Sequence, residues 1–248
     1  MTAVYVLWLR ELRRYTRSRV QIVASLGQPM LYLLALGFGL GPTFQKAGNG
    51  SYMQFVAPGV IGMTILFSAV FSGIGLLWDR QFGFLKETLV APVPRLHIML
   101  GKTLGGANVA FLQGLLMFAI SYLVGFRPVS VVSIPIGLAF MALIAIVFAA
   151  LGTAIGSTLR DMQGFQMIMN FLIMPIFFLS GALFPLTNLP TPLLVATRLD
   201  PLSYGVDGLR GAFIGLANIG VAFDVVVLGV LATAFLILGA WAFSRIQV

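Results

Sequence analysis

The chain of 248 residues contains no cysteine, one histidine and few charged residues. Without cysteine it can form neither a disulfide nor a thiolate metal site. The single histidine, His97, also excludes a histidine metal cluster. Charged residues make up only 9% of the chain, whereas a soluble domain carries roughly a quarter. A soluble globular protein is therefore a poor explanation of this composition.

Acidic residues are especially scarce, and all of them lie outside the long apolar runs or at their edges. The seven acids are Glu11, Asp79, Glu87, Asp161, Asp200, Asp207 and Asp224. Pumps and ion-driven transporters place ionisable groups within the membrane, so the sequence shows no evident proton relay. It also shows no Ser/His/Asp or paired-carboxylate arrangement of a hydrolase. We expect no catalytic residue and no metal site in this chain.

The tripeptide Gly101-Lys102-Thr103 resembles the end of a phosphate-binding loop, G-x-x-x-x-G-K-[ST]. That loop requires a first glycine where this chain has Leu96, and a leucine obstructs the tight turn that holds phosphates. The residues after Lys102 are uncharged as far as Phe126, as in a membrane helix. We therefore expect Lys102 to be a basic residue at the cytoplasmic end of a span. Any ATP hydrolysis should occur on another chain.

Hydrophobic residues make up 59% of the chain, and the mean hydropathy is +1.02. A spanning helix needs about 20 apolar residues, and six runs reach this length. The predicted spans are Gln21–Gly41, Phe55–Leu77, Thr103–Gly125, Ile134–Thr158, Phe165–Phe184 and Ala222–Phe243. The sequence thus predicts an all-α membrane protein with six transmembrane helices, forming one domain over residues 1–248.

Basic residues set the expected orientation. The net charge is +8, and with the N-terminus inside, all but four of the 15 basic residues fall on inner segments. The four outer ones are Lys46, Arg127, Arg198 and Arg210. Because positive residues favour the cytoplasmic side, we expect both termini in the cytoplasm of a bacterium, with the chain in its inner membrane. This explanation of the charge requires no nucleic-acid partner.

Residues 1–20 are typical of an amphipathic helix. Arg10, Arg13, Arg14 and Arg17 recur at i, i+3, i+4 and i+7, which places them on one helical face. Val4, Trp8, Leu12 and Tyr15 share the opposite face. A basic face opposite an apolar face with tryptophan favours a helix that lies in the membrane interface. A plain positive stop before the first span is the alternative.

Two segments between spans have their own organisation. The inner segment 78–102 contains the helical stretch "RQFGFLKETLV", which Pro92 and Pro94 should end. The outer segment 185–221 is too apolar for a solvated loop and too interrupted by proline for a span. Asp200 followed by Pro201 is a good helix start, and Asp207 and Arg210 are spaced to pair on one face. We expect two short re-entrant helices there, covered by protein.

Several motifs, in order along most of the chain, resemble the membrane permease subunit of ABC-2-type exporters. These include the drug-resistance and lipo-oligosaccharide export permeases. The motifs are "SYMQFVAPGVIGMTIL", "KETLVAPVPRLHIMLGK", "NFLIMPIFFLSGALFPL" and "LPTPLLVATRLDPLSYGVDGLRG". The resemblance implies a six-span half transporter that pairs with a second permease copy, as a homodimer. It also implies two copies of a separate ABC ATPase, which carry the ATP and Mg, and no cofactor on this chain.

The resemblance also assigns roles to residues. It makes the N-terminal amphipathic helix the connecting helix and places the coupling helix, which touches the ATPase, around Phe82–Pro94. The expected coupling residues are Phe84, Lys86, Glu87, Pro92 and Arg95. We expect Glu87 to pair with a basic residue of the ATPase or of the N-terminal helix. An intrachain pair with Lys86 or Arg80 is the open alternative.

By the same resemblance, the second and fifth spans line the substrate pathway. The expected residues are Met63, Phe67 and Phe71 in the second span, and Asn170, Met174, Phe177 and Phe178 in the fifth. Flexible methionine and flat phenylalanine suit varied amphipathic compounds such as drugs, lipids or lipid-linked glycans, although they suit ordinary helix packing equally. The expected function is alternating access driven by ATP on the partner.

Two other functions remain open from the sequence. The chain could be a secondary transporter or channel that works without an ATPase, but the spans show no ionisable group to support this. It could also be a membrane enzyme acting on lipid, for which the outer residues Asp200, Asp207 and Arg210 are the only candidates.

Overall fold

The computed structural model describes residues 2–46, 51–90, 92–186 and 190–246, and the side chains of Thr2, Lys86 and Leu89 lie outside this description. The described residues form helices and no strand, which confirms the predicted all-α fold. The first helices are α1 (Thr2–Arg17), α2 (Arg19–Gly39), α3 (Gly41–Lys46), α4 (Tyr52–Phe71), α5 (Ile74–Gln81) and α6 (Phe84–Val90). The others are α7 (Arg95–Val124), α8 (Ile134–Thr158), α9 (Met162–Leu179), α10 (Thr191–Leu199), α11 (Pro201–Ile214) and α12 (Val221–Ser244), with a short 3-10 turn at Val131–Ser133.

Six segments of the described chain are long and apolar enough to cross a membrane, as predicted. They are α2, the continuous segment of α4 and α5, α7, α8 with its preceding turn, α9 and α12. The third span begins at Arg95 rather than Thr103, so Lys102 lies two turns inside it. The fifth ends at Leu179 rather than Phe184, because the chain turns at Gly181 with a positive φ of 71°.

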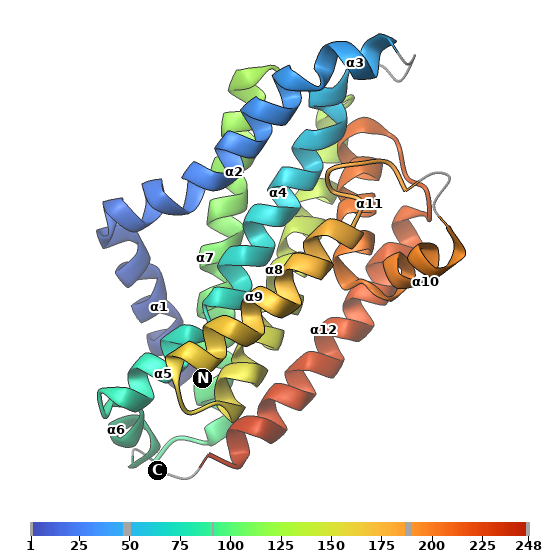
Figure 1. Ribbon diagram of the computed structural model, residues 1–248. Coiled ribbons are helices and arrows are strands. Elements are labelled where there is room, and N and C mark those ends of the chain that lie inside the picture. Colours follow the sequence, from blue (N-terminus) through green and yellow to red (C-terminus); the bar gives the residue numbers. More distant parts are fainter. Residues whose placement is uncertain (1, 47–50, 91, 187–189, 247–248) are drawn as a thin grey trace.

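Figure 1 shows a bundle whose two chain ends lie at the same end, together with α5 and α6. Helix α3 lies at the opposite end, and α10 and α11 lie against the side of the bundle away from the termini. An even number of crossings explains why the termini share an end. We call the end with the termini the terminal end.

Helix α4 lies at the centre of the bundle. In its span 72% of the most apolar window is buried, compared with 17% for α12. Its side chains share a core with those of α7, α8 and α11, including Val60, Ile144 and Val206. Because a span that faces lipid leaves apolar side chains exposed, α12 lies on the lipid-facing side and α4 does not.

A break separates α4 from α5 at Ser72 and Gly73. Gly73 packs directly on α8, where a Cβ would lie 2.2 Å from the carbonyl oxygen of Gly152. Gly152 in turn approaches the backbone of Val70 equally closely. Only residues without a side chain allow this contact, so the end of the second span is held against the fourth by backbone packing.

The two predicted segments between spans are helical. In the inner segment, the expected single helix is divided at Gly83, whose φ of 80° favours glycine, into the end of α5 and the separate α6. In the outer segment, α11 starts as predicted, with Asp200 accepting a hydrogen bond from the N–H of Leu202 and Pro201 in the first turn. Helix α10 precedes it.

Candidate functional site

Helix α1 packs closely on α7 at the terminal end of the bundle. Gly101 and Gly105 face α1, and a Cβ on them would lie 2.9 Å from the Cβ of Leu7 and 2.8 Å from the Cβ of Glu11. Small residues four apart let helix backbones approach within a membrane. This contact buries Leu7, Glu11 and Tyr15 of α1, so α1 is fixed to the bundle along one face.

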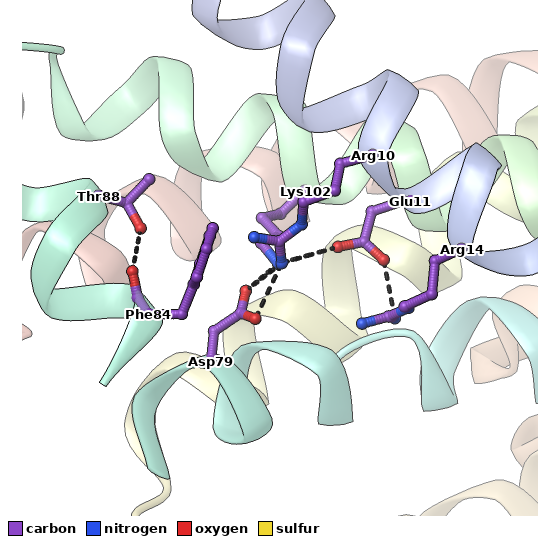
Figure 2. Close-up of polar contacts among 7 residues, drawn as sticks. All are labelled: Arg10, Glu11, Arg14, Asp79, Phe84, Thr88 and Lys102. Atoms are coloured by element: carbon purple, nitrogen blue, oxygen red, sulfur yellow. Dashed lines mark hydrogen bonds and ion pairs between the residues drawn. The ribbon is translucent and has the colours of Figure 1, made fainter. Parts of the chain in front are cut away.

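The close approach brings together a buried group of charges, shown in Figure 2. The ammonium group of Lys102 lies 2.9 Å from Oε1 of Glu11 in α1 and also binds the carboxylate of Asp79 in α5. The three residues are between 7% and 8% exposed. A buried ammonium group is costly unless it is paired, and here Lys102 has two carboxylates.

Two arginines of α1 complete the group. Arg10 donates to both oxygens of Asp79 at 2.8 Å, and Arg14 lies 2.7 Å from Oε2 of Glu11. We call Arg10, Glu11, Arg14, Asp79 and Lys102 the ionic junction. Its three cations exceed its two carboxylates by one charge, and each carboxylate has at least two cationic partners.

The ionic junction also contacts α6. The guanidinium group of Arg10 lies 4.2 Å from the ring centroid of Phe84, a cation–π contact. Figure 2 shows Phe84 beside the junction. The carbonyl oxygen of Phe84 accepts a hydrogen bond from the hydroxyl of Thr88. Four helices, α1, α5, α6 and α7, therefore meet through specific contacts at the ionic junction.

The expected coupling residues surround this point but do not all act in the same way. Phe84, Glu87 and Pro92 are exposed, and none of the ion pairs found among the described residues includes Glu87. Arg95 donates to the carbonyl oxygens of Ser244 and Ile246 and so caps the end of α12. The side chain of Lys86 lies outside the described residues.

The four arginines of the expected connecting helix also divide into two pairs. Arg10 and Arg14 bind carboxylates, whereas Arg13 and Arg17 are in none of the ion pairs found among the described residues. The helix itself is confirmed. Its buried side chains are Leu7, Glu11 and Tyr15. Of the expected apolar face only Tyr15 is therefore buried, and Val4, Trp8 and Leu12 are half-buried, because α1 packs on α7.

A cavity of about 360 Å³ adjoins the ionic junction and lies between α1 and α2 on one side and α4 and α7 on the other. Glu11 and Arg14 line one part of it, and the expected pathway residues Met63, Phe67 and Phe71 line another. Its polar lining is mostly uncharged and includes the side chains of Gln21, Ser25, Gln28, Ser68 and Gln113. The cavity can thus offer hydrogen bonds and aromatic surface to one molecule.

The expected pathway residues of the fifth span do not share this cavity. No residue of α9 is among the described residues that line it. Phe177 is buried and packs against Phe67 and Tyr32, with ring centroids 6.3 and 6.2 Å apart. Asn170, Met174 and Phe178 are exposed on the surface of the described chain.

The outer residues have structural partners. Asp207 accepts hydrogen bonds from the backbone N–H groups of Asn218 and Ile219, and Arg210 donates to the carbonyl oxygens of Gly181 and Ala182. Among the described residues Asp207 and Arg210 form no direct ion pair, since each side chain binds backbone groups instead, although the charge of Asp207 still acts on Arg210. Burial raises the pKa of Asp200 to about 7 and lowers that of Arg210 to about 10.

Sequence reasoning missed the roles of Glu11, Asp79 and Lys102. Lys102 was expected at the end of its span, and the two acids had no assigned partner. One signal was present: Gly101 and Gly105 flank Lys102 with small-residue spacing, which indicates a helix packed closely over that lysine. No three His, Cys, Asp or Glu side chains in the described part of the chain are grouped to hold a metal.

Comparison with known proteins gives a consistent result. The sequence profile of the ABC-2 type transporter family matches residues 2–214 of this chain. The match extends from α1 through α11 and therefore includes the ionic junction, the cavity and the outer helices.

Curated relatives match over most of their length. The chain is 29% identical over 236 residues to the inner membrane transport permease YadH of Escherichia coli K12, covering 94% of this chain and 91% of YadH. It is 29% identical over 211 residues to nodulation protein J of Rhizobium leguminosarum bv. trifolii, covering 84% and 80% of the two chains. It is 31% identical over 200 residues to the ycf38 transport permease of Pyropia yezoensis, covering 78% and 68%.

Proposed function

The chain belongs to the ABC-2 type transporter family, and we propose that it is the membrane permease subunit of an ATP-driven exporter. A separate ABC ATPase binds the terminal end of the bundle and hydrolyses ATP with Mg. The termini and α6 face the cytoplasm of a bacterium, and the six spans cross its inner membrane. The single observation that supports this proposal best is the ionic junction, which links the exposed α6 to the cavity.

Helix α6 is the proposed contact with the ATPase. It is short, it lies at the terminal end (Figure 1), and it follows a turn at which Phe82 is 70% exposed. Phe84 and Val90 are exposed as well. Apolar side chains at the end of a bundle, beyond the lipid-facing spans, favour a protein partner. Glu87 adds a charge on the same helix for an ion pair with that partner.

The ionic junction transmits the movement of α6. When ATP closes the ATPase dimer, α6 shifts, and the contact between Phe84 and Arg10 pulls on α1. Asp79 and Lys102 carry the same displacement to α5 and α7, because breaking a buried pair costs about 3–5 kcal/mol. The helices then move together rather than separately, and the cavity between α2 and α4 changes shape.

The cavity is the proposed part of the substrate pathway. Uncharged amides and hydroxyls beside Met63, Phe67 and Phe71 fit an amphipathic molecule such as a drug, a lipid or a lipid-linked glycan. A second copy of the chain, in a homodimer, covers the exposed face of α9 and brings Asn170, Met174 and Phe178 to the shared pathway. Helices α10 and α11 re-enter the membrane from the outer side.

A secondary transporter is the second candidate, and one observation favours it. Asp224, in the first turn of α12, is fully buried beside Asp207. No donor among the described residues reaches its carboxylate. A buried carboxyl group near a membrane boundary can bind a proton during transport.

Reconstitution tests the two candidates. The permease and its ATPase are inserted into vesicles, and transport is measured with ATP, and with an ion gradient alone. We expect transport only with ATP, and a Glu87→Ala permease should lose most of the substrate-stimulated ATPase activity while its thermal unfolding is unchanged. Transport driven by a gradient without the ATPase would refute the exporter proposal in favour of a secondary transporter.

A further inference from the structure

A second polar site lies at the terminal end, away from the ionic junction. A cavity of about 260 Å³ lies where α8 and α12 end beside α5. Its lining includes the three arginines Arg80, Arg160 and Arg245, together with Trp241 and Thr158. We call this the basic cavity. No acidic side chain is among the described residues that line it.

Binding to the carbonyl groups at the ends of the neighbouring helices does not explain the presence of all three arginines. Basic residues are common at helix C-termini because they bind the last carbonyl groups. Arg80 donates to the carbonyl oxygen of Leu159 at the end of α8, and Arg95 donates to those of Ser244 and Ile246 at the end of α12. The described hydrogen bonds give Arg160 and Arg245 no such carbonyl.

Nearby acids are engaged elsewhere. Asp161, next to Arg160, accepts hydrogen bonds from the N–H of Gly164 at 3.1 and 3.2 Å as the N-cap of α9. Asp79, next to Arg80, belongs to the ionic junction. Among the described residues that line the basic cavity, Arg160 and Arg245 therefore supply positive charge that no described carboxylate offsets, which fits an anion with several oxygen acceptors.

An apolar groove also lies on the surface of α12. It has a volume of about 510 Å³ and is lined by Val226, Gly229, Val230, Thr233, Ala234 and Ile237. We call it the α12 groove. Val230, Ile237 and Trp241 are 63%, 64% and 53% exposed, and their spacing of about one or two turns places them on one face.

The same face continues into the basic cavity. Trp241 lines that cavity, and Arg245, four residues later, lies over the Trp241 ring at 3.9 Å from its centroid. From Val230 to Trp241 the face is about 16 Å long at 1.5 Å per residue. This length matches the roughly 15 Å depth of one leaflet of the bilayer core. Tryptophan at this depth is typical of the membrane interface.

We propose that an anionic phospholipid binds here, with its phosphate group in the basic cavity and an acyl chain in the α12 groove. The charge of the cavity selects an anionic headgroup, and the adjoining apolar face requires an occupant with a hydrocarbon chain. Basic pockets between spans on the cytoplasmic side are suited to such headgroups. The bound lipid joins the ends of α5, α8 and α12, next to the turn that leads to α6.

Native mass spectrometry of the full-length permease tests this inference. The detergent-purified protein is titrated with phosphatidylglycerol, with zwitterionic phosphatidylethanolamine and with soluble glycerol phosphate. We expect phosphatidylglycerol to bind at least about tenfold more tightly than the other two. The variant Arg160→Gln/Arg245→Gln should lose about tenfold in this affinity, whereas the matched control Arg13→Gln/Arg17→Gln, with exposed arginines on α1, should lose little.

A second variant separates the headgroup from the chain. Ala234→Phe fills the middle of the α12 groove. It should weaken the binding of phosphatidylglycerol without changing the affinity for glycerol phosphate. Equal binding of phosphatidylglycerol and phosphatidylethanolamine would overturn the proposal. Binding of glycerol phosphate as tight as that of phosphatidylglycerol would overturn it in favour of a soluble phosphate ligand. The arginine variant could instead keep its affinity for phosphatidylglycerol but no longer bind the ATPase subunit. In that case the basic cavity is a contact with a protein, and the proposal is again refuted.

Discussion

Lys102 in α7 and Glu11 in α1 form a 2.9 Å ion pair across 91 positions of the chain. The pair is buried, and Asp79 of α5 binds the same ammonium group. A contact between residues so distant in sequence fixes the N-terminal helix to the third span. Arg10 of α1 reaches Asp79 across the same contact between helices, whereas Arg14 binds Glu11 within α1 itself.

The first prediction concerns Lys102. Lys102→Met should lower the free energy of unfolding by about 1.5–3 kcal/mol, because Glu11 and Asp79 stay buried and lose a shared cation, although each keeps an arginine partner. Thermal unfolding of the purified permease in detergent measures this. The control Arg13→Gln, on the exposed side of α1, should change stability by no more than about 0.5 kcal/mol. Equal stability of the two variants would show that the buried pair contributes nothing.

The second prediction concerns the α1–α7 contact. Gly105→Leu should separate the two helices, because even a Cβ at this position lies 2.8 Å from the side chain of Glu11. Loss of close packing and of the Lys102–Glu11 pair should lower the unfolding temperature. Gly27→Leu is the matched control, since a Cβ at Gly27 in α2 meets no atom within 4 Å. If both variants unfold at the same temperature, the close approach is not needed for stability.

The third prediction concerns the link between α6 and α1. Phe84→Ala removes the ring beneath Arg10 and should reduce transport per ATP hydrolysed in the assembled complex. Stability should fall by no more than about 1 kcal/mol, because cation–π contacts at partly exposed sites are weak. Phe84→Tyr keeps an aromatic ring and should restore coupling. Normal coupling in Phe84→Ala would exclude this contact as a transmitter of movement.

The fourth prediction concerns the cavity. Ser68→Phe places a ring in the space between α2 and α4 and should reduce transport by about tenfold or more while leaving basal ATPase activity of the complex intact. The control Leu123→Phe enlarges a side chain that is 83% exposed on α7 and should transport normally. Normal transport by Ser68→Phe would place the substrate pathway elsewhere.

The fifth prediction concerns pH. Burial raises the pKa of Asp200 from 3.8 to about 7, so between these values the folded chain binds more protons than the unfolded chain. Stability should therefore fall as pH rises through this window, by up to a few kcal/mol. Asp200→Asn can still cap α11 but cannot ionise, so its stability should vary less between pH 5 and pH 8. Thermal unfolding at both pH values measures this, and an unchanged slope would contradict the assignment.

Helical spans were predictable because their signal is local. The helix of the fourth span, α8, was predicted with both ends as found, Ile134–Thr158, although the apolar segment extends back to Val131. The start of α11 was predictable for the same reason, because Asp200 and Pro201 act within one turn. The start of the third span was not predictable. Arg95 has its partners at the end of α12, and Lys102 has its partners in α1 and α5, so neither residue can be placed from local sequence.

The candidate site was predictable only in part. Met63, Phe67 and Phe71 share one helical face, and the structure places all three beside one cavity. Asn170 and Phe178 have the same kind of spacing, yet they are exposed on the surface. Helical periodicity gives the face a residue occupies, but it does not say which neighbour covers that face.

The sequence by itself determined that the chain crosses a membrane six times and which family it resembles. Both follow from apolar length and from the order of short motifs, which need no knowledge of contacts. Only the tertiary structure decided which charges meet. A buried charge is stable only beside its partner, and the partners of Lys102 lie 91 and 23 positions away. The close packing of Gly101 and Gly105 against α1 brings Glu11 to Lys102.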